Sequence, residues 1–121
     1  MEELIVALHM HTSYSDGRGL HKDLVQAGLE AGVDVLLVSD HNVLVQGLDG
    51  YHQKGKQRLL VLVGEELHDP TLPEKGSHLL VFGHNQELSR FTDDPQKLID
   101  RASAAGAVSL IAHPIEDPLP M

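Results

Sequence analysis

Hydrophobic residues occur along the chain in five short runs, separated by polar and glycine-containing segments. Each run is rich in valine, leucine, isoleucine or alanine and lacks the strict alternation of a strand with one face in water. This pattern is typical of buried strands that are covered on both faces. It predicts strands over Leu4–Leu8, Val33–Val38, Leu59–Val63, Leu79–Phe82 and Ala107–Ala112.

Two of the intervening segments have a helical pattern. The segment before the second predicted strand repeats leucine and alanine at helical spacing and ends at Gly32, a residue suited to a helix C-cap. Ahead of the fifth predicted strand, Asp94 suits an N-cap, Pro95 the first helical position, and Gly106 the end of the helix. We also predict a helix over Val43–Lys56, although this stretch contains three glycines.

Strands that alternate with helices favour an α/β fold with a parallel sheet or barrel. The stretch His68–Ser77 contains two prolines and predicts a loop. No repeat or linker divides the chain, so we expect one domain over residues 1–121. A closed parallel barrel usually needs about 200–250 residues. The chain is therefore expected to be part of a barrel, an open-sheet variant, or a unit completed by another chain.

The charge of the chain limits the kinds of molecule that it is expected to bind. It has 18 acidic and 9 basic residues, a net charge of −9, and no basic run. This composition argues against a nucleic-acid or anionic-membrane surface. The chain lacks cysteine and any apolar stretch approaching ~20 residues, which excludes disulfides, thiolate ligands and a membrane-spanning helix. Its acidic start is unlike a signal peptide, and we expect a cytoplasmic protein.

Histidine is unusually frequent, with nine residues in the chain, and several follow the predicted strands. His9 and His11 follow the first run, and residues i and i+2 of a strand point to the same side. His41 and His113 come after the second and fifth runs in the same way, as does Glu66 after the third. Because carboxyl ends of parallel strands meet at one edge, their joint recurrence predicts a metal site there.

Five motifs in this order resemble the PHP (polymerase and histidinol phosphatase) superfamily. They are "HMHTSYSDG", "VSDHN", "GEEL", "SHLLVFG" and "IAHP", and the match runs from about Leu4 to Pro114. The resemblance implies a distorted (β/α)7 TIM-like barrel, of which this chain would hold about the first five strands. It also implies two or three divalent metal ions, with zinc, manganese and iron as candidates.

The resemblance further implies a set of ligands. One metal would be held by His9, His11 and a bridging Glu66, a second by Glu66, His78 and His113, and a third by Asp16 and His41. Glu66 is preferred to Glu65 because the motif is Gly-x-Glu counted from Gly64, but the two could exchange roles. His84 is an alternative to His78, because it follows the predicted strand that His78 precedes.

Other polar residues have weaker assignments. Asp40 is either an outer partner that orients a ligand histidine or a turn residue. Arg18 is a candidate contact for a substrate phosphate or a solvated loop charge. His113 could protonate the leaving group. We expect the remaining histidines to be solvated surface residues, with His68 the first exception to consider because it closely follows Glu66; these are His21, His52 and His68.

The resemblance implies a metal-dependent phosphoesterase that cleaves a small-molecule phosphate ester with a metal-activated water, with Glu66 and His113 as catalytic residues. The chain departs from the family pattern in one place. The family's last motif, Asp-x-His, does not follow His113, after which only eight residues remain. We expect that the chain continues past Met121; otherwise the first and third metals each lack a ligand. The alternatives are a catalytically silent metal-binding module, an exonuclease-like domain, or a hydrolase of C–N bonds. We expect neither nucleic-acid nor membrane partners.

Overall fold

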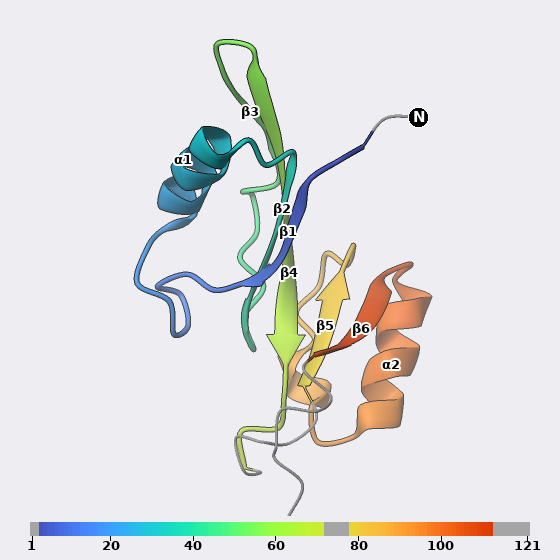
Figure 1. Ribbon diagram of the computed structural model, residues 1–121. Coiled ribbons are helices and arrows are strands. Elements are labelled where there is room, and N and C mark those ends of the chain that lie inside the picture. Colours follow the sequence, from blue (N-terminus) through green and yellow to red (C-terminus); the bar gives the residue numbers. More distant parts are fainter. Residues whose placement is uncertain (1–2, 72–77, 113–121) are drawn as a thin grey trace, which may run out of the picture.

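The structure is a computed structural model that describes residues 3–71 and 78–112, and it contains one strongly curled sheet (Figure 1). The sheet has six strands in the order β1-β2-β4-β5-β6, and β3 pairs with β4 off this path. The strands are β1 (Val6–Met10), β2 (Val35–His41), β3 (Gly50–Lys54), β4 (Gln57–Leu67), β5 (His78–Phe82) and β6 (Val108–Ala112). The curled sheet forms a half-barrel, which agrees with a partial barrel of the expected type.

The strand directions differ from an all-parallel sheet. β1, β2 and β4 are parallel, but β5 runs antiparallel to β4, and β6 runs antiparallel to β5. The segment between β4 and β5 is too short for the helical crossover that a parallel pair requires. Because β5 is reversed, its first residue, His78, lies at the edge where β2 and β4 end.

Both helices with clear capping signals form as predicted. α1 spans His21–Ala31 and ends at Gly32, whose φ of 76° is the left-handed conformation that glycine adopts readily. α2 spans Pro95–Ala104, and the Asp94 side chain accepts a hydrogen bond of 3.1 Å from the backbone N–H of Lys97. A short 3-10 helix, η1 (Ser89–Phe91), precedes α2.

The predicted helix over Val43–Lys56 is wrong. The chain runs without regular structure to Asp49, and β3 then forms a hairpin with the first half of β4. Gly47, Gly50 and Gly55 all have positive φ values, of 85°, 145° and 63°. Such conformations break a right-handed helix and permit the turns that this hairpin needs. The three glycines were therefore the stronger signal in this segment.

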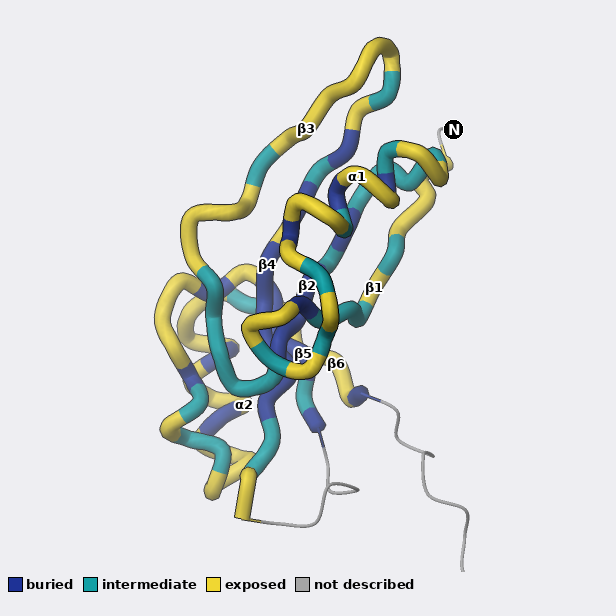
Figure 2. Tube along the Cα trace, turned by 90° about the vertical axis from the view of Figure 1, so that its left-hand side faces the viewer, coloured by how far each residue is buried: buried dark blue, intermediate teal, exposed yellow. Residues whose placement is uncertain are grey.

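Both helices pack against one face of the sheet. Val25 of α1 packs with Leu36 and Val61, and Leu98 of α2 packs with Val81. Figure 2 shows that β2 and β4, in the middle of the sheet, carry the largest buried stretch. Since side chains alternate along a strand, the opposite face carries the even-numbered residues of β4, including Glu66.

Gly64 allows β5 to approach β4 closely. A Cβ atom at this position would lie 2.1 Å from the carbonyl oxygen of Val81 and 2.4 Å from the ring of Phe82. A side chain here would therefore force apart the paired strands just before Glu65 and Glu66.

In the part of the chain that the structure describes, no helix is long and apolar enough to span a membrane.

Candidate metal centre

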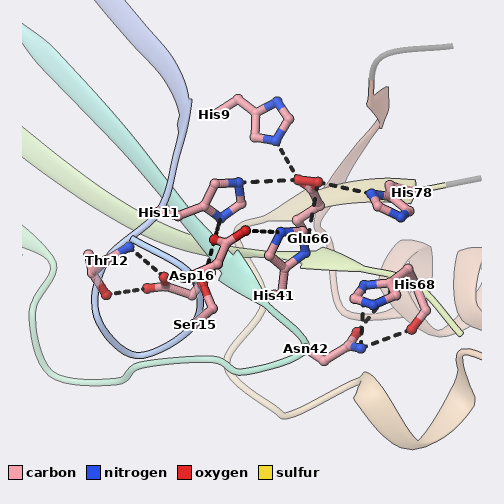
Figure 3. Close-up of polar contacts among 11 residues, drawn as sticks. His9, His11, Thr12, Ser15, Asp16, His41, Asn42, Glu66, His68 and His78 are labelled. Carbon is pink, nitrogen blue, oxygen red and sulfur yellow. Dashed lines mark hydrogen bonds and ion pairs between the residues drawn. The ribbon is translucent and has the colours of Figure 1, made fainter. Parts of the chain in front are cut away.

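Glu66, near the end of β4, is the centre of a histidine cluster (Figure 3). Its carboxylate contacts Nε2 of His9 and lies 3.5 Å from Nε2 of His11. On its other side it lies 3.1 Å from Nδ1 of His78 and 3.9 Å from Nδ1 of His41. The Glu66 side chain is only 1% exposed, so four imidazoles surround a buried carboxylate.

Asp16 extends this cluster toward solvent. Its carboxylate lies 3.2 Å from Nε2 of His41 and 3.7 Å from Nδ1 of His11. The rings of these two histidines are stacked, with centroids 4.4 Å apart and an angle of 5° between their planes. His11 and His41 therefore connect the exposed Asp16 to the buried Glu66.

Within the described residues, three overlapping groups bring their ligand atoms within 4.8 Å of one another. They are His9–His11–Glu66, His11–Asp16–His41 and His41–Glu66–His78. Neutral imidazole and carboxylate are the ligands that zinc, manganese and iron accept. Buried Nδ1 atoms of His11 and His41 have no hydrogen-bond partner among these residues, and a metal ion would satisfy such atoms. The donor set thus fits divalent metal ions.

His9 reaches Glu66 through a bulge rather than through regular alternation. The register between β1 and β2 shifts between Leu8 and Met10, and the intervening His9 has a φ of 70°. A residue other than glycine in this conformation costs about 1–3 kcal/mol, and such strain gathers at functional sites. The expected convergence of His9 and His11 is present, but the backbone geometry behind it is different.

Asp40 anchors the loop between β1 and α1. Its Oδ1 accepts hydrogen bonds of 2.6 Å from the Thr12 backbone N–H and 2.7 Å from the Ser15 hydroxyl. Its Oδ2 accepts a third, of 2.7 Å, from the Thr12 hydroxyl. Asp40 therefore positions the loop that carries His11 and Asp16, and none of its hydrogen bonds to described residues goes to a ligand ring.

The same loop needs a glycine at position 17. The Gly17 N–H donates a 2.9 Å hydrogen bond to the Thr12 carbonyl, which closes the loop on itself. A Cβ atom on Gly17 would lie 2.3 Å from the carbonyl oxygen of His11. A larger residue would thus displace the backbone that carries the cluster histidine.

The electrostatics of the cluster favour a charged Glu66 and a neutral His11. Burial by itself would raise the pKa of Glu66, but hydrogen bonds with His78 and His9 outweigh it and hold the pKa below its ordinary value. Burial lowers the pKa of His11, and the neighbouring His41 lowers it further, against the opposing effect of Asp16 and Glu66. A carboxylate with neutral imidazoles is the protonation state that binds metals.

Glu65 lies on the opposite face of β4 from this cluster. It is fully buried, and its Oε1 lies 2.7 Å from Nε2 of His84. Burial, together with the nearby carboxyl group of Glu87, raises the pKa of Glu65 to about 9. Burial also lowers the pKa of His84. The two neighbouring glutamates thus have different environments, and the structure places His78, not His84, beside Glu66.

We predict that Glu65 makes the metal-free protein less stable as the pH rises. Between the unfolded pKa of 4.5 and the folded value of about 9, the unfolded chain has lost a proton that the folded protein keeps. Stability therefore falls with rising pH in this window, by at most about 1.4 kcal/mol per pH unit. Glu65→Gln removes this loss, so its free energy of unfolding should increasingly exceed that of the wild type.

Urea unfolding of both proteins in EDTA, from about pH 5 to about pH 8, measures this difference. Titrating groups that do not contact Glu65 are common to the two proteins and cancel in the comparison. A difference that does not change with pH would show that Glu65 ionises normally in the folded protein.

The structure brings together most of the predicted site residues: His9, His11, Asp16, His41, Glu66 and His78. Arg18 is exposed in the β1–α1 loop and makes no hydrogen bond or ion pair with another described residue. His113 lies outside the described residues. The prediction of a solvated surface position is wrong for His21, which is 7% exposed and packs edge-on against the Tyr14 ring. His52 is exposed on β3 as expected, while His68 is half-buried beside the cluster.

Sequence reasoning missed Asn42, which follows the cluster histidine at the end of β2. Its φ is 52°, and its side chain makes two hydrogen bonds to the backbone of His68. The available signal was the residue type, because asparagine tolerates a left-handed conformation better than most residues. Nothing in the sequence indicated the partner across the sheet.

Comparisons with known proteins agree with the geometry. The family model described as the PHP domain matches residues 7–108. The chain is 33% identical over 89 residues to DNA polymerase III subunit alpha of Helicobacter pylori, in two strains. That match covers 66% of this chain but only 7% of the polymerase subunit. With the motifs, the curled sheet and the histidine cluster all in place, the chain belongs to the PHP domain family.

Proposed function

We propose that this chain forms the metal-binding half-barrel of a metal-dependent phosphoesterase that acts on a small-molecule phosphate ester. The observation that carries the proposal is the position of Glu66 between two of the three candidate groups, His9–His11–Glu66 and His41–Glu66–His78. A single carboxylate shared by two groups supports a multinuclear centre, and such centres suit phosphate ester hydrolysis.

Divalent metals, when bound, would neutralise phosphoryl charge and supply an activated water as the nucleophile. The residues of the chain have separate tasks. Glu66 and the histidines around it supply the ligand atoms, and Asp40 holds the loop that presents His11 and Asp16. Asp16 is largely exposed, so its group marks the side from which a substrate could enter.

The charge of the chain favours a small substrate. Its net charge of −9 repels a long polyanion more strongly than a compact phosphate ester that contacts the metals directly. Arg18 lies in the same loop as Asp16 and is free to turn toward a bound phosphate. We therefore propose a phosphomonoester, nucleotide or sugar phosphate as the substrate class.

The match to a DNA polymerase subunit supports a second candidate, hydrolysis of a nucleic-acid end. It requires the same metal cluster but a surface that follows a phosphate backbone, which the acidic balance of this chain opposes. A third candidate is a module that binds metal without catalysis.

We expect hydrolysis of para-nitrophenyl phosphate by the manganese-loaded protein, and its loss in Glu66→Gln. Glu65→Gln is the matched control, because it makes the same chemical change on the other face of β4 and should retain activity. Cleavage of a single-stranded oligonucleotide in preference to small esters would support the nucleic-acid candidate. Metal binding with no turnover of any phosphate ester would contradict the proposal and favour the third candidate, a module that binds metal without catalysis.

A further inference from the structure

His68 lies beside the metal cluster but in none of its candidate groups. It is the first residue after β4 and follows Glu66 by two positions. Its ring centroid is 4.7 Å from that of His78 and 5.2 Å from that of His41 (Figure 3). The three candidate metal groups of the described residues use His41 and His78 and leave His68 out. Among the described residues, His68 is thus a neighbour of the candidate ligands and a member of none of their groups.

Asn42 fixes the position of His68. Its Oδ1 accepts a 3.0 Å hydrogen bond from the His68 backbone N–H, and its Nδ2 donates a 2.9 Å hydrogen bond to the His68 carbonyl. The backbone N–H of Asn42 donates a 3.1 Å hydrogen bond to the Glu66 carbonyl. These bonds join the ends of β2 and β4 and hold His68 in place. They require a left-handed backbone conformation at Asn42, which is unfavourable for a residue other than glycine.

The same contacts indicate which nitrogen of His68 carries the proton. A backbone N–H can only donate, so the atom that accepts from it must be the oxygen of the Asn42 amide. The amide nitrogen then lies 3.5 Å from Nδ1 of His68, and it can only donate to that atom. The neutral ring then carries its proton on Nε2, because the one ring hydrogen bond between His68 and another described residue is at Nδ1.

We propose that His68 donates its Nε2–H to a phosphoryl oxygen of the substrate, with Asn42 as its positioning residue; this inference rests on the proposed function. A phosphate held at the metal groups would bring its oxygens close to the rings of His41 and His78, and His68 packs against both. The hydrogen bond is charge-assisted, since the acceptor is an anionic oxygen. His68 then contributes to substrate affinity rather than to metal binding.

The test is calorimetric titration of inorganic phosphate into the manganese-loaded protein, with the metal content of each variant measured in parallel. His68→Ala should weaken phosphate affinity about tenfold, since it removes one hydrogen bond to a charged group, and should leave the metal content unchanged. His68→Gln carries an N–H in place of Nε2 and should recover most of the affinity. His52→Ala, on the exposed β3, is the control and should match the wild type.

Asn42→Gly tests the positioning role. Glycine accepts the φ of 52° without strain, so this variant removes the side-chain hydrogen bonds and keeps the backbone path. Its phosphate affinity should fall between those of the wild type and His68→Ala. In turnover with para-nitrophenyl phosphate, both variants should raise KM by a larger factor than they lower kcat.

Three results would overturn the inference. If His68→Ala binds phosphate within about twofold of the wild type, His68 does not contact the substrate. If His68→Ala loses metal, the residue is a ligand or a structural support. If the wild type binds metal but neither binds phosphate nor hydrolyses esters, the proposed function fails as well. The first two results leave that function standing.

Discussion

Glu66→Gln should abolish metal binding at both groups that share this residue. The substitution keeps the shape of the side chain but removes the negative charge and one acceptor oxygen from a position that is only 1% exposed. Even an outer partner of a metal ligand typically contributes 10–100-fold to affinity. Loss of a shared carboxylate should therefore weaken metal affinity by at least about a hundredfold. The remaining group, His11–Asp16–His41, keeps its ligand atoms.

Elemental analysis after dialysis against manganese or zinc measures this effect. Glu65→Gln is the control, because Glu65 is adjacent in sequence but lies outside the cluster and contacts His84 instead. A Glu66→Gln protein that retains the metal content of the wild type would remove Glu66 from the centre. Equal losses in the two variants would point to damage to β4 and not to a missing ligand.

Asp40→Ala should destabilise the protein and loosen the metal site together. The substitution leaves the Thr12 N–H and the hydroxyl groups of Thr12 and Ser15 without their acceptor, and Thr12 is fully buried. Hydrogen bonds to a charged group contribute about 1.5–3 kcal/mol each, and the loop can rehydrate in part. We expect the free energy of unfolding to fall by about 3 kcal/mol, with weaker metal binding at the Asp16 group.

Asp40→Asn separates the hydrogen bonds from the charge. The asparagine oxygen can accept from the Thr12 N–H and the Ser15 hydroxyl, while its amide nitrogen donates to the Thr12 hydroxyl oxygen. This variant should lose about 1 kcal/mol. Urea unfolding of the metal-free proteins gives both values. A loss below about 1 kcal/mol in Asp40→Ala would show that the loop is held by other contacts.

The residues of the candidate site were predictable because they follow apolar runs whose ends meet in space. His11, His41 and Glu66 each come three positions after such a run, and the strand edge brings them together. Helix α2 was equally predictable, since Asp94 and Pro95 act through local chemistry that no distant contact overrides. Local signals of this kind do not depend on the rest of the fold.

The features that were missed depend on partners far away in the sequence. Asp40 bonds a loop 28 residues earlier, and Asn42 holds a residue 26 positions later. His21 is buried because the β1–α1 loop brings Tyr14 over it, and no helical pattern shows this. The reversed direction of β5 follows from the length of the segment before it, which has too few residues for a crossover helix. This direction explains why His78 can join the cluster from the start of a strand.

The central claim is that the histidine cluster around Glu66 is a metal centre. The most direct test is calorimetric titration of manganese or zinc into the metal-free wild type and Glu66→Gln, with the intact mass of the chain checked first. The account predicts two or three metal ions per wild-type chain, and a loss of binding in the variant. A wild-type chain that binds no metal, or a variant that binds as much as the wild type, would contradict it.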